Sequence, residues 1–261
     1  MSMPRHGHSG TSRVPLAHRE RIDWHTHDDH QLLFPHRGVL HVRTAHGDWM
    51  VPPHRAVWLP ARVPHAHEAI GTTELRAVTF APARNPLRLD RPAVLVVTPL
   101  LREVVAALTG DEEQAAGPRR NLEAVALDQL RRVEALRVHL PTPDDPRLAD
   151  IARILHADPG DPRTLAELGA AIGASERTLS RLFRTRTGMT FPQWRTQLRL
   201  HHALTGLATG RSVTRVAAEC GYSSPSAFIH AFSAAFGTTP GAYVSADASR
   251  NSRRLPTGSV E

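Results

Sequence analysis

The sequence predicts an α+β protein, in which an N-terminal β-sandwich or barrel is followed by a helical linker region and an all-α C-terminal domain. Three observations support this fold class. Short extended segments separated by glycine and proline fill residues 19–97, a pattern typical of sandwiches and barrels. After Pro99 the apolar residues recur at helical spacing. From residue 147 onward, a pattern of two short helices joined by a glycine turn occurs twice.

The composition limits the class of protein before any motif is considered. The 261 residues are enough for two domains, and a hydrophobic content of 41% can supply a core for each. All 32 basic residues are arginine and the formal net charge is +7, which favours partners that carry phosphate. Because a GC-rich genome that avoids lysine codons produces the same bias, the placement of the arginines carries more weight than their number.

The cysteine content and the apolar runs indicate the compartment. Cys220 is the only cysteine, which excludes an internal disulfide and a multi-cysteine zinc site and fits a reducing compartment. The N-terminus has no apolar segment of the kind found in secretory signals, and the longest apolar run, 93–97, is too short to cross a bilayer. We therefore expect a cytoplasmic protein without a membrane partner.

The N-terminal region divides into a polar tail and a series of extended segments. Residues 1–18 lack hydrophobic periodicity and are predicted to be a disordered tail. Residues 19–97 are predicted to form the barrel. Its strands are expected at 31–34, 39–42, 49–51, 56–59, 65–70 and 75–80.

Two amphipathic helices are predicted within residues 98–140, at Pro99–Thr109 and Asn121–Val138. Either their apolar faces pack on the barrel of the same chain, or one of them supplies the seam of a homodimer. Residues 141–146 contain three prolines and are predicted to be a linker. The apolar face of the first helix comprises Leu100, Leu101, Val104, Val105 and Leu108, and that of the second comprises Leu122, Val125, Ala126, Leu130, Val133 and Leu136.

The C-terminal domain, predicted to span residues 147–245, contains its helical pattern in two copies. In the first copy, Thr164 and Glu167 have the spacing of a capping box, and Gly173 ends the helix. In the second copy, Gly221 takes the place of Gly173, and Ser224 followed by proline begins the next helix. The repetition predicts two helix-turn-helix units, and residues 246–261 are predicted to be a disordered tail.

These residues resemble the AraC/XylS family of bacterial regulators. The family's closing signature has a counterpart here in Phe236-Gly237-Thr238-Thr239-Pro240-Gly241-Ala242-Tyr243. The resemblance covers residues 147–244 and implies a transcription regulator that binds double-stranded DNA at a promoter. It also implies a regulator, either an activator or a repressor, that contacts RNA polymerase and acts as a homodimer, rather than an enzyme.

The resemblance also implies which side chains contact DNA. Arg177, Ser180 and Arg181 would read bases from the second helix of the first unit, with Thr178 and Arg184 beside them. Residues 147–246 carry 11 arginines and 6 acidic residues, which supports this interpretation. The second unit is expected to contribute mainly phosphate contacts and thymine-methyl or shape readout, because the residues at its equivalent positions are less suited to specific contacts with base edges. They are Ser226, Ala227, Ile229 and His230.

A histidine pattern in the N-terminal region resembles the two metal-binding motifs of the cupin barrels. The resemblance implies a cupin-like β-barrel (jelly roll) that binds an effector. Four candidates, His25, His27, Gln31 and His65, are expected to converge, with glutamine where enzymes of that superfamily usually have glutamate. Alternation along one extended strand is expected to place His25, His27 and Gln31 on the same side, and His65 is expected to approach from the adjacent strand. They would hold a divalent metal (Zn, Ni, Fe or Mn) or form a polar effector pocket without metal. The other histidines of the region are predicted to lie at the surface or rim: His30, His36, His41, His46, His54 and His67.

Three function classes fit these patterns. The first is a regulator whose barrel binds a small-molecule effector and thereby alters DNA binding. The second is a cupin metalloenzyme fused to a DNA-binding module, and the third is a direct metal sensor. Because Gln31 is neutral and no catalytic base is obvious unless Asp28, Asp29 or Glu68 turns inward, the chain is not expected to be an enzyme.

Overall fold

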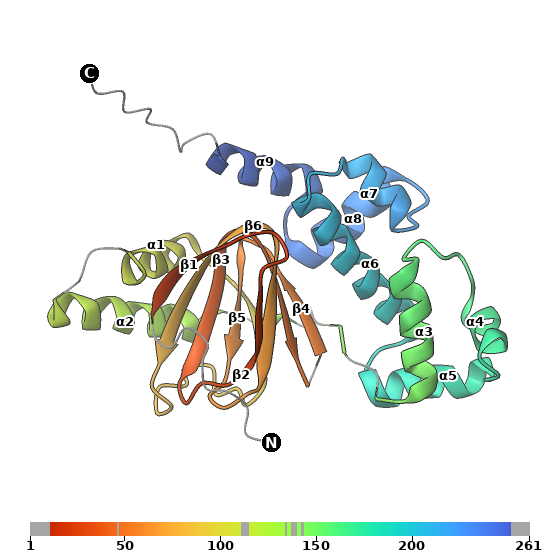
Figure 1. Ribbon diagram of the computed structural model, residues 1–261, viewed down its shortest axis with the longest axis horizontal. Helices are drawn as coiled ribbons and strands as arrows, with labels where there is room; N and C mark the ends of the chain where they lie inside the picture. The colour runs from red at the N-terminus through yellow and green to blue at the C-terminus, as the bar shows by residue number, and fades with distance from the viewer. Residues whose placement is uncertain are drawn as a thin grey trace.

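The computed structural model describes residues 11–45, 47–110, 115–133, 135–136, 140–141 and 144–251. It confirms the predicted α+β fold class. A curled β-sheet with two helices against it lies beside an all-α domain (Figure 1). No helix in these ranges is both long and apolar enough to cross a membrane.

The sheet is antiparallel, and its strands follow the order β1-β6-β3-β5-β7-β8, with β2 also paired to β6 and β4 to β3. The two longest strands, β3 and β6, pair with each other on both sides of a bend. The strands are β1 (Ser12–Leu16), β2 (Arg21–His25), β3 (His30–Thr44), β4 (Gly47–Val51), β5 (Arg55–Leu59), β6 (His65–Phe80), β7 (Ala93–Val96) and β8 (Ala135–Leu136).

The bend in β3 lies at Gly38. This residue has φ +73°, and a Cβ at its position would lie 2.6 Å from the carbonyl oxygen of Thr72. The register of β3 against β6 shifts next to it, between Arg37 and Val39. Such irregularities bend strands, and this one helps to curl the sheet into a barrel.

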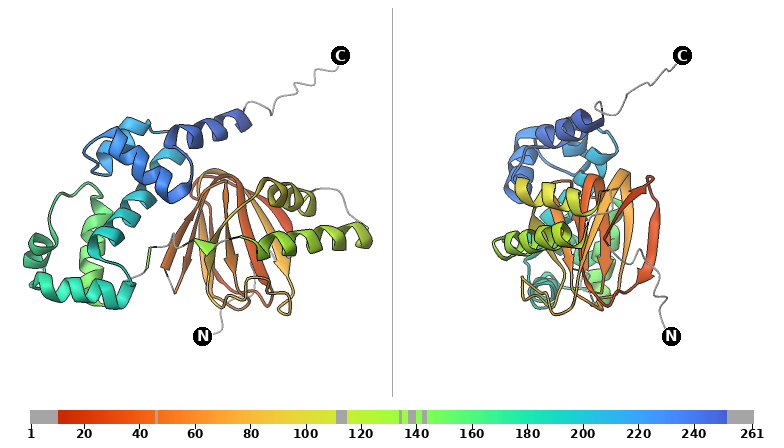
Figure 2. Two further views of the ribbon diagram at one scale, coloured as in Figure 1. Left: turned by 180° about the vertical axis from the view of Figure 1, so that it is seen from behind. Right: turned by 90° about the vertical axis from the view of Figure 1, so that its left-hand side faces the viewer.

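Two hydrophobic layers cover the two faces of the sheet. Strand alternation separates them, because Leu33 belongs to the layer inside the barrel, whereas Leu32 and Phe34 belong to the outer layer. Helices α1 (Pro99–Leu108) and α2 (Ala116–Arg131) pack against the outer layer, on one side of the barrel (Figure 2). Most of the apolar residues predicted for these helices therefore cover the barrel of their own chain.

Three segments differ from the predictions. Strand β1 lies within the segment 1–18 predicted to be a tail, where Val14 and Leu16 are buried; two alternating residues were too short a signal. Helix α2 ends at Arg131, and Ala135–Leu136 extends the edge of the sheet instead. Helix α9 (Pro240–Asn251) runs into the predicted C-terminal tail. Residues 1–10 and 252–261 of these tails, and 142–143 of the linker, lie outside the described residues.

The C-terminal domain forms its two helix-turn-helix units as predicted. The capping box is present, since the Thr164 side chain accepts from the backbone of Glu167 and Glu167 bonds back to Thr164. Ser224 caps the second helix of the second unit. The helices are α3 (Pro146–Ala157), α4 (Leu165–Ala171), α5 (Glu176–Leu182) with a π-helical turn at Phe183–Thr187, α6 (Phe191–Ala208), α7 (Val213–Glu219), α8 (Pro225–Phe236) and α9.

The barrel and the second unit share one hydrophobic core. Val39, Met50 and Ile70 of the barrel belong to the same buried cluster as the apolar residues of α6, α7 and α8. Gly71 lets the end of α6 approach, because a Cβ there would lie 2.9 Å from the carbonyl oxygen of Ala208. The second unit is therefore packed directly on the barrel.

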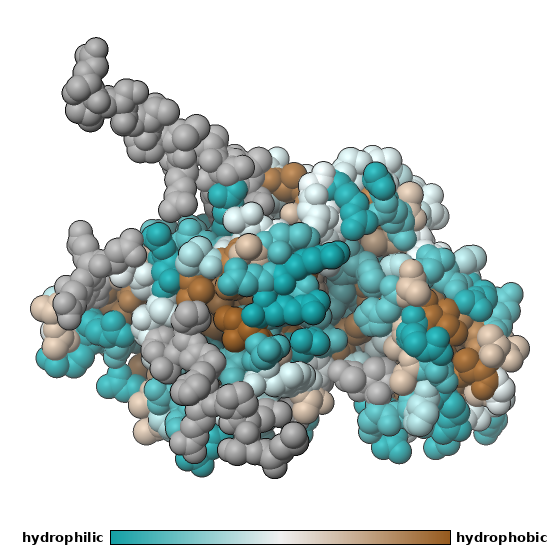
Figure 3. Space-filling model, in the orientation of Figure 1, coloured by the Kyte–Doolittle hydropathy of each residue, from teal (hydrophilic) through white to brown (hydrophobic). Residues whose placement is uncertain are grey.

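The first unit has a separate core. It is built with α3 and the start of α6 around buried residues such as Trp194 and Phe183. Its helices α4 and α5 lie farther from the barrel than α8 does (Figures 1 and 2). Figure 3 shows hydrophobic surface beside α3 and α4 and a further hydrophobic patch over the barrel, on a face that is otherwise mainly hydrophilic.

Several histidines lie where α3 and α6 face the barrel. A cavity of 140 Å³ is lined by His41, Asp48, His156 and His202, among others. Nδ1 of His156 is 3.2 Å from Nε2 of His202, and Nε2 of His41 is 3.8 Å from a carboxylate oxygen of Asp48. The pKa of His202 is lowered to about 4, mainly by burial and to a smaller extent by the neighbouring His156 and Arg211. Burial also lowers the pKa of His156.

We expect the protein to lose stability as the pH falls from about 6.5 to about 4. In this range an unfolded His202 takes up a proton, whereas the folded one does not until the pH reaches its lowered pKa of about 4. Protons therefore favour the unfolded state, and the stability is fully present only above the unfolded pKa. Thermal unfolding midpoints of the wild type and of His202→Gln at about pH 7 and pH 5 measure this. From about pH 7 to about pH 5, the unfolding midpoint of His202→Gln should fall less than that of the wild type. The control His230→Gln, at an exposed site, should match the wild type. Equal falls in all three proteins would contradict the assignment.

Candidate functional site

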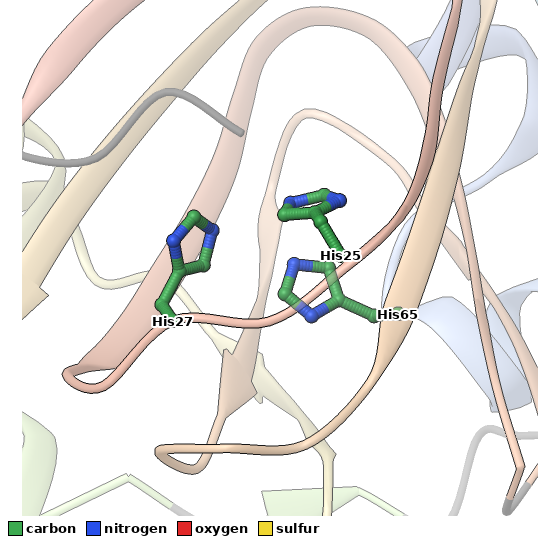
Figure 4. A group of neighbouring side chains, drawn as sticks. All are labelled: His25, His27 and His65. Carbon is green, nitrogen blue, oxygen red and sulfur yellow. The ribbon is translucent and has the colours of Figure 1, made fainter. Parts of the chain in front are cut away.

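Three imidazoles meet inside the barrel. His25, His27 and His65 each bring a ring nitrogen within 4.8 Å of the other two. Their ring centroids lie 4.3 Å apart for His25 and His65, 4.9 Å for His25 and His27, and 5.4 Å for His27 and His65. The three rings turn toward a common space (Figure 4). We refer to them as the histidine trio.

Strand pairing places two members of the trio. His25 ends β2 and pairs with His65, which begins β6. Residues paired across strands point to the same face of a sheet. Farther along β6, His67 is paired with Val42, which belongs to the interior core. By alternation His65 also faces the interior, and so does its partner His25.

The third member, His27, comes from the loop between β2 and β3 (Figure 4). The expectation that His25, His27 and Gln31 follow one side of a single extended strand is therefore wrong. The chain leaves β2 after His25, opposite the start of β6, and begins β3 only at His30, opposite the end of β6. The loop nevertheless turns His27 toward its two partners.

The hydrogen bonds of the trio fix which nitrogens face the common space. Nδ1 of His25 lies 2.6 Å from the carbonyl oxygen of Asp23, and Nδ1 of His65 lies 2.9 Å from that of Val63. A carbonyl can only accept, so each Nδ1 carries the proton and each Nε2 keeps its lone pair. Nε2 of His27 and of His65 is buried without a hydrogen-bond partner among the described residues.

Burial favours the neutral form of two of these rings. The pKa of His65 is lowered to about 4, mainly by burial and also by the neighbouring His25 and His27, although the hydrogen bond to the carbonyl of Val63 raises it. Burial is also the main cause that lowers the pKa of His27. Neutral imidazoles with free Nε2 lone pairs are the form that binds a metal ion, and a backbone partner on Nδ1 is the usual second contact of such ligands. The donor set thus fits a divalent metal.

Gln31 lies on β3, shortly after His27 in the sequence, and its side chain is buried. It alternates with Leu33 of the interior core, so its side chain belongs to the inner face. Its Oε1 is buried without a hydrogen-bond partner in the part of the chain that the structure describes. Convergence of Gln31 on the trio stays a prediction.

Two histidines predicted to lie at the surface are buried instead. His67 is 3% exposed, and its ring lies 5.6 Å from that of His25. Its alternation with His65 was the signal that could have placed it inside. His30 stacks on Trp58, accepts from the backbone N–H of Ala61 and lies 3.1 Å from the carbonyl oxygen of Pro82, so it has a structural role. His36, His41 and His54 are partly buried, and His46 lies outside the described residues.

The first unit presents exposed arginines on its second helix. Arg177 and Arg181 lie on α5, and Arg184 lies on the π-helical turn that continues it. Leu179 and Leu182 anchor the opposite face in the core. Among the residues that the structure describes, none forms an ion pair with these three arginines, so their guanidinium groups are available to a ligand. Thr178 and Ser180 are partly buried between them.

The second unit presents a less basic surface. Ser226, Ala227, Ile229 and His230 are exposed on α8, opposite the buried Phe228 and Phe232. Ile229 is 37% exposed. The predicted residues are thus accessible in both units, and the charge is concentrated on the first.

Two family models match the chain. Residues 16–130 match an AraC-like ligand binding domain, and residues 168–246 match a helix-turn-helix domain. A ligand-binding barrel joined to a tandem helix-turn-helix domain defines a DNA-binding transcription regulator. The chain belongs to the AraC family of transcriptional regulators.

Two relatives that are similar in sequence over most of the chain agree with this assignment. The transcriptional regulator NimR of Escherichia coli is 32% identical over 222 residues, which are 84% of this chain and 81% of that protein. The transcriptional activator RhaR of Klebsiella pneumoniae is 27% identical over 264 residues, 89% of this chain and 92% of that protein. Among solved structures, ToxT of Vibrio cholerae is 11% identical and covers 90% of this chain and 97% of its own, with a TM-score of 0.39.

Proposed function

We propose that this regulator reads promoter DNA mainly through α5, and that an effector bound in the barrel changes its DNA affinity. The observation that carries the proposal is the exposed arginine group at Arg177, Arg181 and Arg184, which has no ion-pair partner among the described residues. Guanidinium groups bind guanine edges in the major groove and phosphates along the backbone. The 18 residues of α6 span ~27 Å, a length suited to holding two units near successive turns of one DNA face.

The effector site is proposed at the histidine trio. Nε2 of His25, His27 and His65, together with the amide oxygen of Gln31, would hold Zn, Ni, Fe or Mn, or would bind a polar effector directly. A bound ion would supply a positive charge and a coordination position for an effector group. The same donor set supports the third class, a direct metal sensor in which the ion is the effector.

The carboxylates around the trio favour a regulator over a metalloenzyme. Glu68 pairs with Arg21 at 2.9 Å, and Asp28 lies 3.7 Å from Arg62 with 72% of its side chain exposed. Asp29 is exposed as well. These groups would have to turn inward to act as a base, and each of the first two already has an arginine partner outside.

We further propose that the chain acts as a homodimeric regulator that contacts RNA polymerase, as the family resemblance implies. The support for a dimer is the outer side of α1 and α2, where Leu100 is 51% exposed and Val125 is 38% exposed. Both were expected on the inward faces of their helices. Solvent-exposed apolar side chains on neighbouring helices fit the seam of a second copy.

Arg181→Ala should weaken binding to a footprinted promoter site by about 1–3 kcal/mol, because a bidentate contact of arginine with guanine has this strength. It should also relax the preference at one base position. Arg184→Ala should weaken all sequences alike and reduce the salt dependence. Fluorescence anisotropy with the site and with its single-base variants measures both effects. An unchanged affinity in Arg181→Ala would refute the assignment of α5.

The double variant His25→Ala/His27→Ala should lose any bound divalent metal, because it removes two of the three imidazole donors. Elemental analysis of protein purified without an affinity tag gives the occupancy, with His18→Ala as an exposed-histidine control. Promoter binding through Arg177 and Arg181 should survive, whereas the response to the effector should vanish. Equal metal content in wild type and double variant would reject the metal site.

Leu100→Glu/Val125→Glu should convert a dimer into a monomer, because two buried apolar contacts would become charged. Each loss of about 1.4 kcal/mol in the free energy of dimerisation raises the dissociation constant of the dimer tenfold. Light scattering on the full chain measures the mass of the species in solution. A concentration of about tens of micromolar detects dimers with micromolar dissociation constants. Arg120→Glu on the exposed side of α2 is the control. A wild-type protein that is monomeric under these conditions would argue against the seam.

A further inference from the structure

A second cavity lies between the barrel and the second helix-turn-helix unit, apart from the histidine trio. Its volume is 460 Å³, within the range of sites that bind small organic molecules. One wall comes from the barrel domain and includes Arg55, Val97 and Arg102. The other wall comes from the end of α8 and the start of α9 and includes Phe236 and Tyr243. We refer to it as the interdomain cavity.

Arg55 is an unusual lining residue because it is buried and has no acidic partner. It is 6% exposed, and its Nη2 donates one hydrogen bond of 2.7 Å to the carbonyl oxygen of Phe236. Its Nε is buried without a hydrogen-bond partner, and no described carboxylate pairs with it. A buried cation without a counterion is costly. An anion in the cavity would relieve that cost.

Arg102 supplies a second guanidinium to the same cavity. It lies on α1 and is partly buried, and its Nε is also buried without a partner among the described residues. Neither guanidinium has an acidic partner among the described residues, and each offers a planar set of donors suited to a carboxylate. The rest of the lining, with Val96, Val97 and Tyr243, is suited to an apolar body.

We propose that the interdomain cavity is a binding site for an organic carboxylate with an apolar tail, held by Arg55 and Arg102. The proposal adds a ligand site to the regulator described above and rests on that function only for its effect on DNA binding. The ligand would touch both walls, so it would bind only the arrangement in which α8 is packed on the barrel. Such unequal binding to two conformations is what allows a ligand to change DNA affinity.

Calorimetric titration of the full chain with octanoate, and with 1-octanol as the neutral probe of equal length, tests the site. We expect saturable binding of octanoate and at least about tenfold weaker binding in Arg102→Gln, because one hydrogen bond to a charged group is lost. Arg120→Gln, which removes an exposed arginine of α2 outside the cavity, should bind like the wild type. His25→Ala/His27→Ala should also bind normally, since the trio lies elsewhere.

Three results would overturn the proposal. They are a dissociation constant for octanoate weaker than about 1 mM, equal affinity for 1-octanol and octanoate, and equal octanoate affinity in wild type and Arg102→Gln. Promoter affinity measured with and without octanoate then separates the two claims. Promoter binding without octanoate binding defeats the cavity alone, whereas octanoate binding without promoter binding defeats the proposed function alone.

Discussion

The apolar contact between the barrel and the second helix-turn-helix unit is the constraint on which the rest of the arrangement depends. Val39 and Ile70 enter the same buried cluster as Phe228 and Phe232 of the second unit. Gly71 permits the close approach of α6 that brings them together. Because apolar area is removed from water on both sides, separating the domains would expose a core rather than a wet interface. The orientation of α8 is thereby tied to the shape of the barrel.

This contact distinguishes the two helix-turn-helix units, because only the second shares a core with the barrel. The first unit has its own core around Trp194 and carries arginines on α5 that have no ion-pair partner in the described part of the chain. The second has few charged side chains on its exposed face, and the C-terminal end of its α8 is held by Arg55. A unit that is fixed to the ligand-binding domain is suited to transmit a change of the barrel. A unit with exposed guanidinium groups and an independent core is suited to recognise the sequence.

How much of the structure could be predicted depended on how far apart in the sequence the interacting residues lie. Caps such as Thr164 and Ser224 and the repeated glycine turns are local, so the helix-turn-helix units were predictable residue by residue. The trio was predicted from its resemblance to the cupin motifs, whereas the argument from strand alternation failed for His27, which reaches the trio from a loop. Strand β1 depends on pairing with distant residues of β6, whereas the burial of His67 could have been inferred from its alternation with His65. The interdomain cavity was beyond prediction, because Arg55 and Phe236 lie 181 residues apart.

The position of the trio gives it a direct mechanical connection to the DNA-binding domain. His65 begins β6 and Ile70 lies five residues later on the same strand, in contact with the second unit. A ligand that pulls His25 and His65 together would act on β2 and β6, and any shift of β6 reaches Ile70 through the backbone. The interdomain cavity adjoins the opposite end of the same connection, at the end of α8. Two ligands could therefore bias one packing arrangement, and their effects would be linked through it.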